Sequence, residues 1–81
     1  MKPDYTNLVK YCVERLVDEP DSVSVDSRTD RSGAYINVTV APNDVGKVIG
    51  RNGRIVNALR SLVSSVGAKQ RQRVYVKVVS D

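Results

Sequence analysis

The residues best suited to holding a charged ligand lie in one short stretch, residues 50–54. Gly50 and Gly53 have no Cβ atom, so the chain can turn sharply there and another backbone can approach closely. Arg51 and Arg54 supply positive charge, and a helix that begins near Arg54 directs free N–H groups toward an anion. This spacing predicts a clamp for a phosphate chain. The alternative is that Gly50 only ends a helix in a left-handed cap and that Gly53 is a turn glycine.

Catalytic chemistry has few candidate residues in this chain. It contains no histidine and a single cysteine, Cys12, and these residue types supply most metal ligands and most nucleophile–base pairs. The acidic residues Asp18, Glu19 and Asp21 surround Pro20 without any other type of ligand, so a solvated loop explains them better than a metal site. We therefore expect no enzyme activity, no metal site and no cofactor.

Positive charge is concentrated in the part of the chain that contains the glycine stretch. Residues 1–30 carry four lysines or arginines against seven acids, a net charge of −3, whereas residues 31–81 carry nine against two, a net charge of +7. A surface of one sign attracts an oppositely charged polymer more strongly than a neutral small molecule. The distribution therefore favours a polyanionic partner.

The length of the chain predicts one domain, spanning residues 1–81. With 81 residues and 41% hydrophobic content it can build a single thin core, so a deep enclosed pocket is not expected. Residues 1–4 precede no apolar segment of the kind found in signal peptides or membrane spans, and one cysteine cannot form an intramolecular disulfide. We therefore expect a cytoplasmic protein.

Two segments have the periodicity of an amphipathic helix. Apolar residues recur every three or four positions from residue 4 to about residue 18, with Asp4 as a candidate N-cap and Pro20 as the stop. The same period runs over residues 54–66, after which Gly67 is expected to end the helix.

Three segments alternate apolar and polar residues as strands do. Residues 23–27 and 34–40 are expected to form a hairpin around the polar loop 28–33, and residues 74–79 form the last strand. Residues 45–49 predict a short helix, which Asn43 and Asp44 cap and Gly50 closes. This order of elements predicts an α+β fold, in which a three-stranded mixed sheet is covered on one face by three helices.

The apolar arc on the predicted helix 54–66 is unusually wide. Ala58 and Leu62 lie on one flank of the arc, away from the edge that carries Val56, Leu59 and Val63. Either the helix is wedged deeply into the core, or this flank is an exposed apolar strip that meets a partner.

The segment Val48-Ile49-Gly50-Arg51-Asn52-Gly53-Arg54-Ile55 lies between two predicted helices and follows a hairpin. It resembles the I-G-x-x-G signature of a KH domain, and the αββααβ order resembles the type II, prokaryotic arrangement. The likeness covers essentially the whole chain. At this length the sequence is most similar to the small bacterial single-KH proteins of the KhpA family.

This resemblance implies that the loop clamps about four nucleotides of single-stranded RNA by their backbone. Relatives often have two basic residues inside the loop, whereas here Asn52 follows Arg51, and Asn52 can still donate hydrogen bonds. The resemblance implies contacts to phosphate from residues 50–53, flanked by Lys47 and Arg54. Ile49 is assigned to the groove or to the core beneath it, and Asn57 to a polar contact.

The resemblance also implies a biological role. It is that of a sequence-tolerant RNA-binding protein, either a post-transcriptional regulator or an RNA chaperone, which forms a homodimer or pairs with a larger KH or Jag-type RNA-binding protein. The competing hypothesis is a dimerisation or adaptor module with little RNA binding of its own. In that case the flank at Ala58 and Leu62 docks a protein and the basic half only keeps the chain soluble.

Overall fold

The computed structural model describes residues 5–80, in which three helices and three strands form as the periodicity predicts. The helices are α1 (Tyr5–Leu16), α2 (Val45–Ile49) and α3 (Arg54–Lys69). The strands are β1 (Ser24–Asp30), β2 (Gly33–Val40) and β3 (Val74–Ser80). The order αββααβ is confirmed. α1 ends at Leu16, shortly before Pro20, and the proposed N-cap Asp4 lies outside the described residues.

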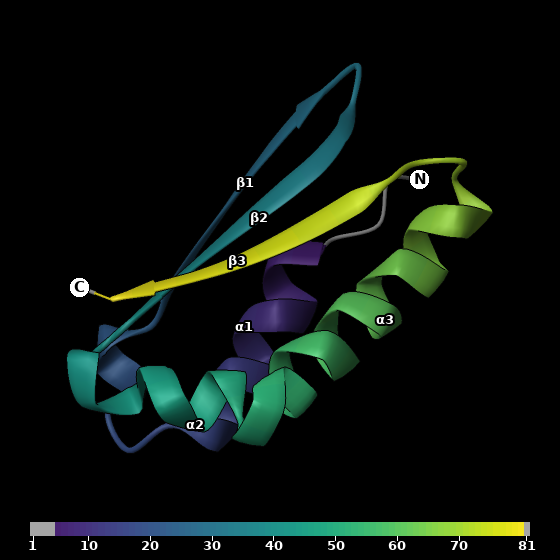
Figure 1. Ribbon diagram of the computed structural model, residues 1–81. Helices are drawn as coiled ribbons and strands as arrows, with labels where there is room; N and C mark the ends of the chain where they lie inside the picture. Colours follow the sequence, from purple (N-terminus) through teal and green to yellow (C-terminus); the bar gives the residue numbers. More distant parts are fainter. Residues whose placement is uncertain (1–4, 81) are drawn as a thin grey trace.

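The sheet is mixed, with β2 between the other two strands. β1 pairs with β2 in antiparallel fashion. β3 pairs with β2 in parallel, because α2 and α3 return the chain to the end of the sheet at which β2 begins. Figure 1 shows the three helices on one side of the sheet, and its other face is open. The predicted α+β fold, with three helices covering one face of a three-stranded mixed sheet, is therefore confirmed.

Alternation along the strands separates the core from the open face. The inward side chains of β2 are almost completely buried, whereas Asn37 between them is exposed and Tyr35 and Thr39 are half-buried. From the helices, Val9, Val13, Val48 and Val63 reach the core with no exposed surface. The inward residues of the sheet are Ala34, Ile36, Val38, Val40, Val74 and Val76.

The hairpin loop is shorter than the predicted segment 28–33. β1 continues to Asp30, which pairs with Gly33, so that Arg31 and Ser32 form the whole connection. The Asp30 carboxylate accepts hydrogen bonds from the backbone amide and the hydroxyl of Ser32, both at 2.8 Å. These two hydrogen bonds stabilise the two-residue turn. The polar residues Arg28, Thr29 and Asp30, which were expected in the loop, therefore pair with β2.

Gly67 does not end α3, in contrast to the prediction. The helix continues to Lys69, and Gly67 is buried inside its last turns. A Cβ atom at Gly67 would lie 2.6 Å from the backbone oxygen of Gln72 and 2.6 Å from Cγ2 of Val74. Glycine is therefore required at this position because β3 returns closely against the helix.

The predicted capping role of Asp44 is also wrong. Asp44 precedes α2 but makes no side-chain hydrogen bond to the start of that helix. Its carboxylate instead accepts hydrogen bonds from the backbone amides of Asp18 and Glu19, at 3.2 and 3.0 Å. The side chain is 1% exposed, and it joins the segment after α1 to the start of α2. Asn43 is exposed, and no side-chain cap is found at the turn that contains it.

Candidate nucleic-acid interface

The GxxG loop, residues 50–53, turns the chain between α2 and α3 through left-handed backbone conformations. Gly50 has φ 77° and ψ 172°, and its amide donates to the carbonyl of Gly46 at 2.9 Å, which ends α2. Asn52 and Gly53 follow with φ 57° and 74°. Glycine adopts these conformations readily, and asparagine tolerates the left-handed region better than most residues. Each residue type therefore matches the backbone conformation at its position.

Polar side chains of the loop reach solvent at the N-terminus of α3. Arg51, Asn52 and Arg54 are exposed, and the first turn of α3 contains no acidic residue. Because α3 is 16 residues long, its aligned peptide dipoles place partial positive charge beside Arg54. Two exposed arginines and a helix N-terminus thus lie at the same turn. An anion at the loop is favoured by all three.

Lys47 lies one turn before the loop, and its ammonium group is held by carboxylates. Nζ is 2.8 Å from Oδ2 of Asp18 and 3.4 Å from Oδ1 of Asp44. Hydrogen bonds to Asp18 and then to Asp44 raise the pKa of Lys47 above its ordinary value of 10.5. Burial opposes the ionisation of Asp44, but the amides of Asp18 and Glu19 and the Lys47 ammonium group outweigh it and lower its pKa below 3.8. A phosphate at Lys47 competes with both carboxylates.

Two further predicted site residues lie next to the loop. A Cβ atom on Gly53 would be 3.6 Å from Nδ2 of Asn57, so the exposed amide of Asn57 lies beside the loop. The Oδ1 atom of Asn57 accepts a hydrogen bond of 3.1 Å from Arg60. Ile49 is half-buried and packs against the core, so that only part of its side chain is available to a ligand.

Arg60 connects α3 to the outer edge of the sheet. Its Nε and Nη2 atoms donate to the backbone oxygen of Val76 at 3.2 and 3.1 Å. β3 is an edge strand, so this carbonyl has no neighbouring strand on its outer side. The guanidinium group of Arg60 therefore supplies hydrogen-bond donors to a carbonyl of β3 that has no partner strand.

The apolar flank of α3 is exposed. Leu62 is 45% exposed and Ala58, four residues earlier, is also exposed. The two residues lie on the same side of the helix. Of the two explanations for the wide apolar arc, the deeply wedged helix is therefore wrong for this flank.

The described residues offer no alternative site for metal chemistry. Within residues 5–80, no group of three or more Cys, Asp or Glu side chains is arranged to hold a metal ion. No helix in this part of the chain is long and apolar enough to cross a membrane.

A model of the KH domain of KhpA and KhpB matches residues 6–78. The chain belongs to this KH-domain family. The match includes both glycines of the GxxG loop and extends from α1 into β3, so the family assignment covers the complete αββααβ order. The resemblance to the KhpA family that the sequence predicts is thereby confirmed.

Several similar bacterial proteins share the name RNA-binding protein KhpA. The chain is 43% identical to the RNA-binding protein KhpA of Caldanaerobacter subterraneus subsp. tengcongensis over 72 residues, which cover 89% of this chain and 96% of that protein. It is 42% identical to the protein of that name from Halalkalibacterium halodurans, over 89% of this chain and 95% of the relative. The KhpA of Streptomyces coelicolor is 48% identical over 61 residues, which cover 75% and 77%. These relatives are named for RNA binding and not for a reaction, which agrees with the expectation that the chain is not an enzyme.

Proposed function

We propose that this protein binds single-stranded RNA by clamping its backbone with the GxxG loop. The observation that carries the proposal is the pair of glycines with φ 77° and 74° at the N-terminus of α3, with Arg51 and Asn52 exposed between them. Glycine at both positions lets the loop keep this tight turn, which other residues adopt at a cost, and leaves its backbone open to an approaching sugar–phosphate chain. The name shared by the relatives supports the same ligand.

In this mechanism the loop holds phosphates and the adjoining helices hold the nucleosides. Arg51 and Arg54 neutralise phosphate charge, and Asn52 donates from its amide. Ile49 contributes apolar surface beside the loop, and Asn57 offers a polar contact to a base or a ribose. Because most of the binding energy comes from the backbone, the protein tolerates many RNA sequences.

Lys47 takes a supporting role in this proposal. Its ammonium group is already paired with the carboxylates of Asp18 and Asp44. This ion pair ties α2 to the segment after α1, and α2 delivers Gly50 to the loop. Lys47 therefore contributes to RNA binding by holding the loop in position more than by direct contact.

Self-association is a second function that a specific observation favours. Leu62 exposes 45% of its surface on α3, and an exposed leucine next to an alanine forms an apolar strip. We propose that Ala58 and Leu62 contact a second copy of this chain or a larger KH or Jag-type RNA-binding protein. The family model, which covers KhpA and KhpB together, supports such pairing. The complex acts in the cytoplasm as a post-transcriptional regulator or RNA chaperone.

Reversal of charge in the loop tests the RNA-binding proposal. Arg51→Asp with Asn52→Asp opposes phosphate at two exposed positions, so binding of a short single-stranded RNA should be lost while the fold remains. Lys10→Glu with Tyr11→Glu makes the same change in net charge on the exposed side of α1 and is the control. Fluorescence anisotropy at physiological ionic strength measures both. Equal affinity of the loop variant and the parent protein would show that the clamp is wrong.

A further inference from the structure

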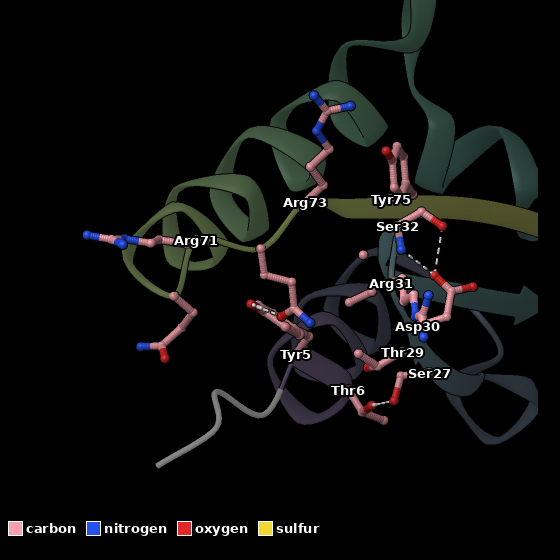
Figure 2. Close-up of a pocket in the computed structure, with 14 residues that line it drawn as sticks. Tyr5, Thr6, Ser27, Thr29, Asp30, Arg31, Ser32, Arg71, Arg73 and Tyr75 are labelled. Atoms are coloured by element: carbon pink, nitrogen blue, oxygen red, sulfur yellow. Dashed lines mark hydrogen bonds between the residues drawn. The ribbon is translucent and has the colours of Figure 1, made fainter.

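Two hollows meet at Tyr75, at the end of α3 that is far from the GxxG loop. A cavity of about 790 Å³ lies under the β1–β2 hairpin and beside the start of α1, and Figure 2 shows the residues around it. A second hollow of about 470 Å³ lies between the end of α3, at Ser64 and Ala68, and the start of β3. Arg71, Arg73 and Tyr75 line both.

Tyr75 is the outermost ring of a short stack on the open face of the sheet. The rings of Tyr35 and Tyr75 are 5.0 Å apart with 17° between their planes, and the guanidinium group of Arg28 lies 5.2 Å from the centre of the Tyr35 ring. Tyr35 therefore has a partner on each side. The hydroxyl group of Tyr35 also donates to Ser32 at 3.0 Å, which fixes the ring.

The other side of Tyr75 is available. β3 is an edge strand, and Tyr75 is 42% exposed. Within residues 5–80 its one aromatic contact is the contact with Tyr35. A planar group that enters from the edge of the sheet can therefore extend the stack.

The charges around Tyr75 suit a polyanion. Arg73 precedes β3 and Lys77 follows Tyr75 by two residues, and Figure 2 shows Arg73 and Tyr75 projecting to the same side of the chain. Among residues 5–80, no carboxylate lines the smaller hollow, and Asp30 is the one carboxylate that lines the larger hollow. Asp30 is already hydrogen bonded to Ser32, and those bonds are the main reason why its pKa lies below 3.8.

We infer that Tyr75 stacks on a base of the bound single-stranded RNA, and that Arg73 and Lys77 contact the phosphates beside that base. An exposed aromatic ring with cationic neighbours is the combination that proteins use to bind single strands without reading their sequence. The inference rests on the proposed function and extends it from the GxxG loop to the opposite end of α3. Tyr75, Arg73 and Lys77 then give the protein a higher affinity for long RNA than for short RNA.

The distance between the two contacts sets the length of RNA that is needed. α3 has 16 residues, and at about 1.5 Å per residue it separates the two ends by about 24 Å. Even at the compact spacing of about 3.4 Å per nucleotide, about seven nucleotides cover this length. Together with the roughly four nucleotides of the clamp this makes about eleven, so an RNA of about twelve nucleotides is long enough to reach both contacts.

Tyr75→Thr tests the inference, because threonine keeps the preference for β-structure and removes the ring. Affinity for an oligouridylate of about twelve nucleotides should fall roughly five- to hundredfold. Affinity for a uridine tetranucleotide, which is long enough only for the GxxG loop, should stay unchanged. Tyr11→Thr is the matched control, since Tyr11 is also an exposed tyrosine with an arginine, Arg15, 4.2 Å from its ring centre. It should alter neither affinity. Circular dichroism and thermal melting check the fold of both variants.

Photocrosslinking gives a second readout that does not require a variant. The parent protein is irradiated with the longer RNA carrying 5-iodouridine, and the modified peptide is identified by mass spectrometry. Attachment to Tyr75 supports the inference even if Tyr75→Thr fails to fold. Attachment confined to residues 49–57 overturns it.

The remaining outcomes separate this inference from the proposed function. If the Arg51/Asn52 variant loses RNA while Tyr75→Thr binds the longer RNA like the parent protein, the clamp stands and the stacking site is wrong. The stacking site is also wrong if Tyr75→Thr changes the mass of the protein in solution and leaves RNA affinity unchanged, because the open face then binds protein. If the parent protein binds neither oligonucleotide, both proposals fail.

Discussion

Gly50 and Ile55 lie in direct contact across the GxxG loop. A Cβ atom built on Gly50 falls 2.7 Å from Cγ1 of Ile55 and 3.0 Å from its Cβ, well inside the contact distance of about 3.5–4.0 Å between carbon atoms. These Ile55 atoms lie close to its own backbone, so they cannot swing away as the end of a long side chain would. The first glycine of the loop is therefore required by packing as well as by its φ of 77°.

Gly50→Ala should be more destabilising than Gly53→Ala. The first substitution forces Ile55 to move and places alanine in a backbone conformation that costs about 1–3 kcal/mol. At Gly53 a Cβ atom would lie 3.6 Å from Asn57, an ordinary contact, so only the left-handed conformation costs free energy, about 1–2 kcal/mol. Urea unfolding measures both free energies. An equal or larger loss for Gly53→Ala would contradict the importance of the Gly50–Ile55 contact.

Asp44 makes the stability of the fold depend on acid pH. The pKa of Asp44 is lowered in the folded protein. The ionised carboxylate therefore contributes fully to the free energy of unfolding at pH values above its ordinary pKa of 3.8, and this contribution is lost as the pH falls through the lower pKa of the folded state. The pKa of Asp30 is lowered too, chiefly by the hydrogen bonds from Ser32, and acts in the same direction. The melting temperature should therefore fall as the pH decreases below about 4.

Asp44→Asn is the variant that checks this dependence. It should melt at a lower temperature than the parent protein at neutral pH and lose less stability in acid, because it has no carboxylate to protonate. Adding Asp30→Asn should reduce further the fall of the melting temperature below about pH 4, which is the acid limb of the pH profile. Lys47 acts at the other extreme, since its pKa is raised above 10.5 and its contribution is lost only as the pH rises through the folded value. A parent acid limb that persists unchanged in the double variant would rule out this assignment.

The order of elements could be predicted because it depends on local periodicity. The alternation of Ile36, Val38 and Val40 and the three- to four-residue spacing of Val56, Leu59 and Val63 are visible in the sequence and are buried in the structure as expected. The position of Gly50 between two apolar segments was likewise sufficient to predict the end of α2.

The errors at Gly67 and Asp44 arise from contacts with segments outside the helix concerned, whereas the error in the hairpin loop arises from local hydrogen bonds between Asp30 and Ser32. Gly67 looks like a helix terminator, but β3 returns against it, and this approach is set by the fold as a whole. Asp44 looks like a cap, but its partners Asp18 and Glu19 are about 25 residues away. The spacing of Asp44 and Lys47, three residues apart, was the available signal for their ion pair. The Tyr35–Tyr75 stack needs the strand register, which alternation alone does not specify.

Gly46 and Gly67 are both helical glycines, and substitution by alanine should have opposite effects on stability. A Cβ atom at Gly46 meets nothing within 4 Å, so Gly46→Ala should raise the free energy of unfolding by about 0.5–1 kcal/mol. At Gly67 the new atom collides with the backbone of Gln72, and the helix must move away from β3 at a cost of about 1–3 kcal/mol. Chemical denaturation of the two variants measures the difference. Two changes of the same sign would contradict the packing seen at Gly67.

Leu62→Asp should convert an assembled form of the protein to a monomer. Leu62 is 45% exposed, so a carboxylate there changes the stability of the isolated chain by only about 0.5 kcal/mol but cannot be buried unpaired against a partner. Light scattering after size-exclusion chromatography measures the mass. Ser64→Asp is the control, because Ser64 is exposed on the same helix but about 200° around its axis from Leu62. If the Leu62 variant stays folded and keeps the mass of the parent protein, the flank at Ala58 and Leu62 is not the contact between subunits.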